Sequence, residues 1–368
     1  MPRYIGLISG TSMDGVDAAL IEVAGDAISL LGYLEVPYPE DLRQTLERAV
    51  TTDAVSLSGL AALHVRVGRE FAAAALALLS EAGQSATGVS AIGSHGQTLW
   101  HAPSGAIPCT LQIGDGASIA AVTGLSVVCD FRSSDVALGG QGAPLVPLFH
   151  EALFGRAGKP TAVVNIGGIA NITLLPGMGS CGLVAFDTGP GNTLMDGWAA
   201  LHLGLAFDAA GAWARSGKLL PDLLARLLEE PYFARTTPKS TGRELFNLEW
   251  LRQRLGSHEA GAPEDIQRTL VELTAVTIAQ DILRHQPEGD AVLVCGGGTR
   301  NLLVIERLTD LLPHRRVQST DHAGVPSAAL EAMAFAWLAH RRVTGQAGNA
   351  PSVTGAAKPA VLGAVYLP

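Results

Sequence analysis

A strand, a glycine-containing turn and a second strand occur twice in this chain, and this recurrence constrains the fold most. The first copy joins the apolar run 4–9 to the alternating run 16–21 through the polar turn GTSMDGVD, from Gly10 to Asp17. The second copy, TAVVNIGGIANITLL over 161–175, turns at Gly167 and Gly168. Two such hairpins about half a chain apart predict two related lobes.

The glycine turns have the composition of anion-binding loops. Small residues let backbone N–H groups approach a phosphate, and Asp14 or Asp17 can hold a hydrated Mg²⁺. A third motif ends the apolar strand 291–295 with Gly296, Gly297 and Gly298, which would offer flat backbone to a nucleobase. Ordinary polar hairpins are the alternative interpretation of the first two turns, and the local sequence does not decide between them.

Three amphipathic stretches predict helices between these strands. Apolar residues recur at helical spacing over 60–78, with Ser56 or Ser58 as the cap, and over 266–283 and 327–342. The second of these stretches leads into the strand that ends at the triple glycine. Strands that alternate with helices predict an α/β fold.

Composition limits the class of partner. The 368 residues are 48% hydrophobic, enough for a large core, and the net charge of −9 makes a general nucleic-acid surface unfavourable. We find neither a signal peptide nor a membrane span and expect a cytoplasmic protein. Walker, Rossmann and GxSxG motifs are absent, and Cys109, Cys129, Cys181 and Cys295 lack the spacing of a zinc site.

Asp187 is the strongest catalytic candidate. It lies in FDTGPGN, after a short apolar strand and before a Gly-Pro-Gly turn, and a carboxylate held rigidly there suits a general base. The alternative is a turn aspartate that bonds its own backbone.

Polar residues at other expected strand ends suit a small polar substrate. Arg132, in DFRSSD, can bind an anionic oxygen with two N–H groups, or can form an exposed ion pair with Asp130 or Asp135. His95 and Thr98 lie in GSHGQTLWH, which is suited to a sugar; a metal site there lacks a third ligand. Glu331 opens the last helix, where a first-turn acid is also common. In KSTGRELFN, Lys239 and Arg243 can meet phosphate or lie in a solvated loop.

Taken in order, these motifs resemble those of the anhydro-N-acetylmuramic acid kinases over nearly the whole chain. The resemblance is carried by eight segments, namely GTSMDGVD, GSHGQTLWH, DFRSSDVALGGQGAPLVPLFH, NIGGIANIT, FDTGPGN, KSTGRELFN, CGGGTRN and GVPSAALEAMAFAWLA. It implies the two-lobed actin-like fold of sugar kinases, Hsp70 and actin, with duplicated mixed-sheet domains and an interlobe cleft. We expect lobe I, on the sugar and phosphate side, to cover 1–130 and about 327–368, and lobe II, on the nucleotide side, to cover 131–326.

The resemblance also implies the reaction and its residues. Water would open the 1,6-anhydro ring of the amino sugar while the 6-oxygen takes the γ-phosphate of ATP, with Asp187 as the base. Substrate contacts would come from His95, Thr98, Arg132 and Glu331, and Mg²⁺ would bind through Asp14. The residues expected to bind ATP or its phosphates are Gly10, Thr11, Ser12, Met13, Asp14, Gly15, Val16, Asp17, Gly167, Gly168, Gly296, Gly297, Gly298 and Asn301.

Two other functions compete with this one. A kinase for another amino sugar or a hexose would need a hydroxyl acceptor but no ring opening. The same fold also serves chaperones and filament subunits, which we disfavour because no peptide-binding domain follows. We expect ATP and the sugar as small-molecule partners, no nucleic acid or membrane partner, and a homodimer.

Overall fold

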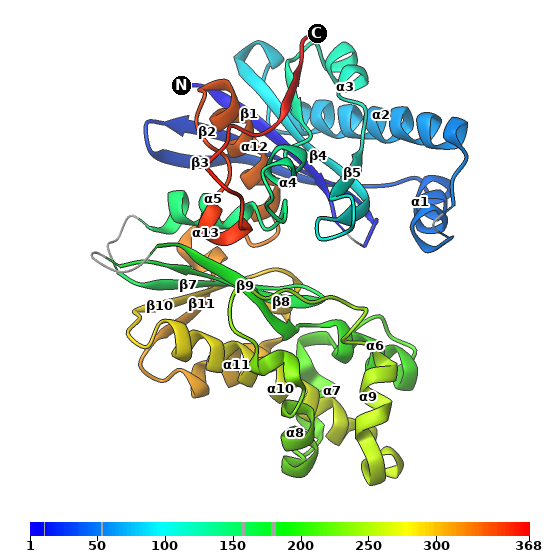
Figure 1. The fold of residues 1–368 in the computed structure, drawn as a ribbon, viewed down its shortest axis with the longest axis vertical. Helices are drawn as coiled ribbons and strands as arrows, with labels where there is room; N and C mark the ends of the chain where they lie inside the picture. Colours follow the sequence, from blue (N-terminus) through cyan, green and yellow to red (C-terminus); the bar gives the residue numbers. More distant parts are fainter. Residues whose placement is uncertain (11, 53, 156–158, 178–181) are drawn as a thin grey trace. The chain divides into compact units, whose positions relative to one another are not determined.

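A computed structural model describes residues 1–10, 12–52, 54–155, 159–177 and 182–368. The chain forms two compact units (Figure 1). Unit 1 contains 1–153 and 329–368, and unit 2 contains 154–328.

Unit 1 is built on a seven-stranded sheet in the order β12-β6-β4-β1-β2-β3, with β5 paired to β4. The pairs β1–β2 and β2–β3 are antiparallel, and β1–β4 and β4–β6 are parallel. Its strands are β1 (Arg3–Ser9), β2 (Gly15–Ala24), β3 (Ala27–Pro37), β4 (Val89–Ala102), β5 (Cys109–Ile113), β6 (Val127–Cys129) and β12 (Ala364–Tyr366).

Unit 2 repeats this arrangement in a five-stranded sheet of order β11-β10-β7-β8-β9. Again the first three strands are antiparallel neighbours, and β7–β10 and β10–β11 are parallel. The strands are β7 (Thr161–Ile166), β8 (Ile169–Leu175), β9 (Val184–Pro190), β10 (Ala291–Cys295) and β11 (Arg316–Ser319). The shared order confirms the predicted α/β fold of two related mixed sheets, the actin-like class.

Helices cover both faces of the sheet in unit 1. Ile5 and Leu7 of β1 pack into a core with α2, while Gly6 between them faces α12. Side chains alternate along a strand, so α2 and α12 lie on opposite faces. The helices of this unit are α1 (Glu40–Thr52), α2 (Leu57–Glu81), α3 (Gly116–Thr123), α4 (Ser133–Ala137), α5 (Val146–Phe154), α12 (Leu330–Val343) and α13 (Pro351–Thr354).

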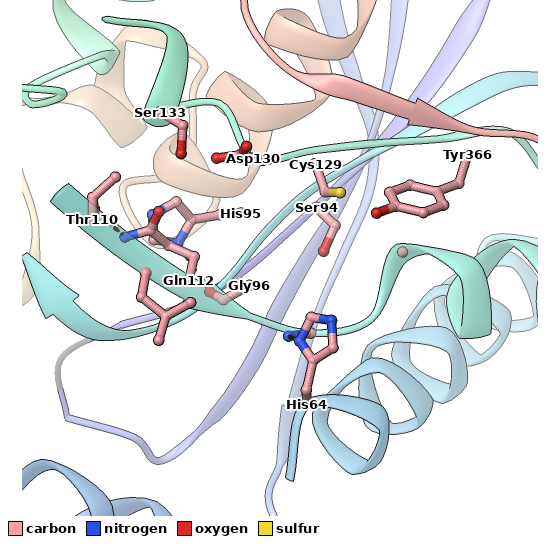
Figure 2. A pocket seen from close by; sticks show the side chains of 13 residues that line it. His64, Ser94, His95, Gly96, Thr110, Gln112, Cys129, Asp130, Ser133 and Tyr366 are labelled. Carbon is pink, nitrogen blue, oxygen red and sulfur yellow. Dashed lines mark hydrogen bonds between the residues drawn. The ribbon is translucent and has the colours of Figure 1, made fainter. Parts of the chain in front are cut away.

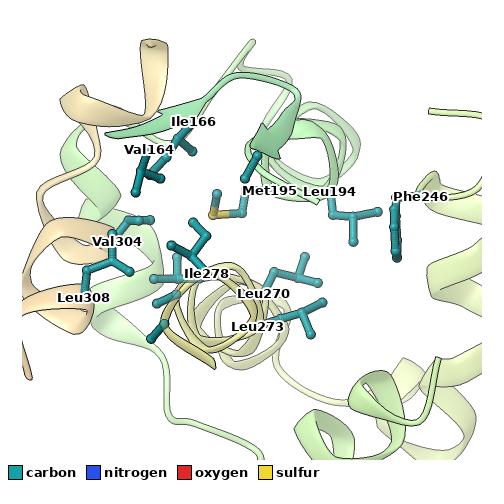
Figure 3. Packing of buried hydrophobic residues seen from close by; sticks show 14 of the residues in the cluster. Val164, Ile166, Leu194, Met195, Phe246, Leu270, Leu273, Ile278, Val304 and Leu308 are labelled. Atoms are coloured by element: carbon teal, nitrogen blue, oxygen red, sulfur yellow. The ribbon is translucent and has the colours of Figure 1, made fainter. Parts of the chain in front are cut away.

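Unit 2 has its own core, centred on α10 (Figure 3). Leu270, Leu273 and Ile278 of this helix pack against Met195 and against Val304 of α11. In Figure 1, α8, α10 and α11 lie on one side of the sheet. The helices are α6 (Thr193–Leu203), α7 (Ala212–Ser216), α8 (Pro221–Leu228), α9 (Leu248–Leu255), α10 (Pro263–His285) and α11 (Leu302–Leu311).

The predicted helices over 60–78, 266–283 and 327–342 are confirmed as α2, α10 and α12. The Ser56 hydroxyl caps α2 by accepting the Gly59 N–H at 3.0 Å, as one of the two expected caps. In the described part of the chain, no helix is both long and apolar enough to cross a membrane.

The first division between the units differs from the expected one. It falls at 153/154, whereas we expected it at 130/131. Residues after 131 stay with unit 1 because the buried Asp135 carboxylate accepts hydrogen bonds from Asn349 at 2.6 Å and Thr354 at 2.7 Å. Pairs this distant in sequence are not visible from local patterns. The second division, 328/329, lies close to the expected 326/327.

The close approach of β1 to α12 leads to a first prediction. A Cβ on Gly6 would lie 1.8 Å from the Ala332 carbonyl oxygen, so the helix must move to admit alanine. We expect Gly6→Ala to lower the free energy of unfolding by about 3 kcal/mol, near the upper end of typical overpacking costs, in urea titration. Gly182→Ala, where no atom of the described residues lies within 4 Å of the added atom, is the matched control. Equal stability of the two variants would contradict this packing.

Candidate functional site

The turn between β1 and β2 carries the first group of predicted phosphate residues. Gly10 accepts hydrogen bonds through its carbonyl from the Met13 N–H at 3.2 Å and the Gln97 side chain at 3.2 Å. Gly15 is required because a Cβ there would lie 2.2 Å from the Val36 carbonyl oxygen. Ser12 and Asp14 are exposed, Val16 is buried, and Thr11 lies outside the described residues. The turn therefore presents Ser12 and Asp14 to solvent on a backbone held by Gln97.

Asp17 lies at the start of β2 among other acids. The Tyr33 hydroxyl lies 2.9 Å from Asp17 Oδ1 and 2.8 Å from Glu35 Oε1, on the neighbouring strand. Burial raises the pKa of Asp17 to about 6, and the nearby carboxylates of Glu35, Glu331 and Asp14 add to the rise. This surplus of negative charge favours a cation.

Arg132 and His95 form a direct pair in unit 1. Arg132 Nε donates to His95 Nε2 at 3.0 Å, and its Nη1 donates to the Gly142 carbonyl at 2.7 Å. His95 Nδ1 lies 2.9 Å from the Gly96 carbonyl, which fits a neutral ring that donates there and accepts from Arg132. Burial and the charge of Arg132 lower the pKa of His95 well below its usual value. The alternative interpretation of Arg132, an exposed ion pair with Asp130 or Asp135, is not how the guanidinium is held, since it donates to His95 and Gly142.

Glu331 and Thr98 complete the predicted substrate group. Glu331 is exposed on α12, and its charge acts on both Arg132 and Asp17, so these three residues share one electrostatic environment. Thr98 Oγ1 accepts a hydrogen bond from Gln112 at 3.2 Å.

A pocket of about 230 Å³ adjoins this group in unit 1 (Figure 2). His95, Gln112 and Ser133 are among its lining residues, and Ser133 follows Arg132 directly. Figure 2 shows the Ser94 side chain pointing into the pocket, in the region of His64 and Tyr366. The Ser94 hydroxyl is fully buried and has no hydrogen-bond partner among the described residues. A buried polar group in this state favours a polar occupant of the pocket.

Unit 2 brings its glycine turns together. The carbonyls of Gly167 and Gly168 accept hydrogen bonds from the N–H groups of Asn192 at 2.8 Å and of Gly191 at 2.9 Å. The triple glycine packs on the end of β7, since a Cβ on Gly296 would lie 2.2 Å from Asn165 Oδ1 and one on Gly298 only 2.3 Å from an Ile166 methyl group. A Cβ added to Gly297 would lie 3.7 Å from the Asn192 side-chain nitrogen, which is ordinary van der Waals contact. The two predicted motifs and the Gly-Pro-Gly turn thus form one backbone surface.

Asn301 caps a helix next to this surface. Its Oδ1 accepts the Val304 N–H at 3.3 Å and caps α11, and its Nδ2 lies 3.9 Å from the sulfur of Met195. The side chain is buried. A nucleotide contact at this position would therefore use the backbone.

Asp187 lies within β9, not at its end as expected. β9 is the edge strand of the sheet, and Asp187 is half-buried beside the segment 239–241. Its Oδ2 accepts the Thr241 N–H at 3.0 Å, and burial raises its pKa to about 6. The Glu244 carboxylate also raises this pKa, whereas the Thr241 hydrogen bond and the Lys239 charge lower it. The alternative of a turn aspartate bonded to its own backbone does not apply.

The two basic residues of KSTGRELFN differ in burial. Arg243 is exposed, and its guanidinium lies against Gly168. A Cβ added to Gly168 would lie 3.2 Å from Arg243 Nη2. Lys239 is buried against Asp281 and is not in a solvated loop. No signal in the sequence indicates this pairing, nor the roles of Tyr33 and Thr241, because each depends on contacts between distant segments.

Comparison with known proteins identifies the family. The sequence model described as anhydro-N-acetylmuramic acid kinase matches residues 2–368. A protein of that name from Pseudomonas paraeruginosa is 50% identical over 367 residues, covering 100% of this chain and 99% of the relative. One from Aliivibrio fischeri is 47% identical over 367 residues, again covering 100% and 99%.

The family match, together with two mixed sheets of the same strand order, makes the chain a kinase with the actin-like fold. The chain belongs to the anhydro-N-acetylmuramic acid kinase family.

Among solved structures, a ROK family glucokinase from Streptomyces griseus in complex with glucose and AMPPNP is 15% identical, with a TM-score of 0.41. That match covers 92% of this chain and 99% of the glucokinase. A ROK hexokinase from Thermus thermophilus is 20% identical with a TM-score of 0.37, covering 92% and 99%. Likenesses this weak add nothing to the family match.

Proposed function

We propose that this protein opens the 1,6-anhydro ring of 1,6-anhydro-N-acetylmuramic acid with water and phosphorylates its 6-oxygen from ATP. The products are N-acetylmuramic acid 6-phosphate and ADP, a step that serves the recovery of cell-wall sugar. The observation that carries the proposal is Asp187, a half-buried carboxylate beside glycine turns in a member of this kinase family.

Asp187 acts as the general base. Its carboxylate takes a proton from water, the water oxygen bonds to the anomeric carbon, and the bond from that carbon to the 6-oxygen breaks. The freed 6-oxygen attacks the γ-phosphorus, and the bond to the β-phosphate oxygen breaks as ADP leaves. A pKa near 6 suits this role, because the group is ionised at neutral pH and yet basic enough to accept a proton.

The glycine turns bind the nucleotide. In unit 1 the turn 10–17 contributes backbone N–H groups and the Ser12 hydroxyl to phosphate oxygens, and in unit 2 Gly167 and Gly168 do the same, with Arg243 beside them. The segment 296–301 contacts the nucleoside. Mg²⁺ neutralises charge on the phosphates when bound. Asp14 fits it, because this ion commonly takes one or two carboxylates together with waters and phosphate oxygens.

The sugar is recognised by unit 1. Arg132 binds the lactyl carboxylate through its remaining N–H groups. His95 and Gly142 accept hydrogen bonds from Nε and Nη1 and so fix the plane of the guanidinium. Thr98 and Glu331 bind sugar hydroxyls. The pocket at Ser94, whose buried hydroxyl has no partner in the described part of the chain, accepts a polar substituent of the sugar. We also propose that the protein acts in the cytoplasm, where ATP is available; the expected homodimer stays a prediction that sedimentation can test.

The raised pKa of Asp187 predicts the pH dependence. The base works only when ionised, so kcat should fall tenfold per pH unit as the pH drops below about 6 and level off above it. Initial rates of ADP release between pH 4.5 and 8.5, with both substrates saturating, measure this limb. A limb near the usual aspartate pKa of about 4 would contradict the assignment.

The competing function is tested in the same assay. ADP release with Mg·ATP and the anhydro sugar should exceed release with N-acetylglucosamine or glucose at equal concentration. Faster turnover of an ordinary hexose would favour a kinase that needs no ring opening.

A further inference from the structure

Lys239, which is a candidate phosphate contact in the sequence analysis, is buried. Its Nζ lies 2.9 Å from Asp281 Oδ2, and the two side chains are 1% and 5% exposed. The ammonium also lies 5.3 Å from the ring centres of both Phe186 and Tyr232, within cation–π range. This charge therefore acts inside unit 2 and does not meet a ligand.

Three hydrogen bonds hold Asp187, two from the backbone of Lys239 and Thr241 and one from the Tyr232 side chain. The Lys239 carbonyl accepts the Asp187 N–H at 3.3 Å, and the Thr241 N–H donates to the Asp187 carboxylate at 3.0 Å. The Tyr232 hydroxyl, whose ring the ammonium faces, donates to the Asp187 carbonyl at 2.7 Å. The segment 239–241 thus lies along the edge strand β9 at Asp187.

A buried ion pair adds little to the free energy of unfolding, because burying the two charges is costly. Removing two charges from water costs several kcal/mol each, and apolar replacements are often equally stable. Here the pair has a second consequence, because Asp281 on α10 fixes the side chain of Lys239 and so fixes the segment that bonds to Asp187. The Lys239 charge also opposes that of Glu244 in its effect on Asp187.

We propose that the buried Lys239–Asp281 pair positions Asp187 for catalysis: it anchors the segment 239–241 to α10 so that the Thr241 N–H meets the Asp187 carboxylate. The inference rests on the proposed function, in which Asp187 is the base. Lys239 and Asp281 are positioning residues and touch neither substrate.

Two substitutions that remove the anchor test the proposal. In both Lys239→Met and Asp281→Asn the Thr241 N–H, which lowers the pKa of Asp187, no longer meets the carboxylate, so that pKa rises. The lost ammonium charge adds to the rise in Lys239→Met, whereas the ammonium left without Asp281 opposes it in Asp281→Asn. We expect a rise of about half a pH unit or more in Lys239→Met and a smaller rise in Asp281→Asn, with kcat about tenfold to a hundredfold lower and KM for ATP within threefold.

The readouts separate this proposal from the proposed function. One is the titration of the Asp187 carboxyl carbon by NMR in ¹³C-aspartate protein without substrate, assigned by its loss in Asp187→Asn; the other is the acid limb of kcat. Arg307→Met is the matched control, because it breaks a pair with the buried Glu272 elsewhere in unit 2. It should lower the melting temperature and move neither readout.

Each outcome decides something. A raised pKa of Asp187 in both variants, with matching shifts of the acid limb, supports both proposals. A lowered pKa in Asp281→Asn would show that the Lys239 charge acts without the anchor and would overturn the positioning role. Shifts of the signal without any change in the limb support the positioning role and remove Asp187 as the base. An unmoved signal with kcat within twofold of wild type in folded variants overturns the positioning role. Should Lys239→Met not fold, Asp281→Asn decides alone, through the direction of its shift.

Discussion

Asp187→Asn should reduce kcat by about a thousandfold to ten-thousandfold while the protein stays folded and binds ATP. Removal of a general base costs about this much when no other group replaces it. The amide is isosteric with the carboxyl group, and its oxygen can still accept the Thr241 N–H that Asp187 Oδ2 accepts at 3.0 Å. Single-turnover ADP release with saturating sugar measures the loss.

Stability provides the control for this variant. Because the pKa of folded Asp187 is raised to about 6, folding favours its protonated form, and its charge costs free energy above that pH. That cost is absent below the unfolded pKa of about 4 and fully present above 6. The asparagine variant should therefore melt at or above the wild-type temperature at pH 8. Activity above a tenth of wild type in such a folded variant would remove Asp187 from the role of base.

Arg132→Met should lower kcat/KM for the anhydro sugar by about ten to a hundredfold and leave KM for ATP within about threefold. The expected loss corresponds to the 1.5–3 kcal/mol, roughly, of a hydrogen bond to a charged group. Arg132 is held by His95 at 3.0 Å and by the Gly142 carbonyl at 2.7 Å, so the plane of its guanidinium is fixed. Steady-state kinetics with each substrate varied in turn measure the two constants.

Two further variants separate charge from geometry at this position. Arg132→Lys keeps the charge but cannot donate to His95, to Gly142 and to a carboxylate at once, so it should recover little activity. Against the anhydro sugar lacking the lactyl group, wild type and Arg132→Met should be nearly equal. An undiminished effect of the substitution on that analogue would show that Arg132 does not recognise the carboxylate.

Local patterns were sufficient for much of the fold. The apolar stripe over 60–78 predicted α2, and the paired glycine hairpins predicted two related sheets; both are confirmed. These signals are carried by neighbouring residues, whose spacing reflects the face that each element buries. Asp135 shows what local patterns miss. Its hydrogen bonds with Asn349 and Thr354 join segments far apart in sequence and hold the residues after 131 in unit 1.

The candidate site was predictable in composition but not in its internal contacts. Arg132 was predicted to contact substrate, with an exposed ion pair as the alternative, but its bond to His95 was not predicted; it forms because β4 and β6 are neighbours in the sheet. In the register of β2 and β3, Glu35 lies opposite Asp17. Tyr33 lies two residues before Glu35 on the same face of β3, so its hydroxyl reaches Asp17. Lys239 is buried because Asp281 of α10 lies beneath it. Register and helix packing are properties of the folded chain, so motifs alone do not reveal them.

The fate of the water oxygen tests the central claim most directly. The protein is incubated with Mg·ATP and 1,6-anhydro-N-acetylmuramic acid in ¹⁸O-water, and the products are quenched quickly and weighed by mass spectrometry. Coupled ring opening and transfer predicts a sugar that carries one phosphate on its 6-oxygen and one heavy oxygen at the anomeric carbon, in step with ADP. A phosphorylated sugar without the heavy oxygen at early times, or ADP release with no such sugar above the sugar-free background, would contradict it.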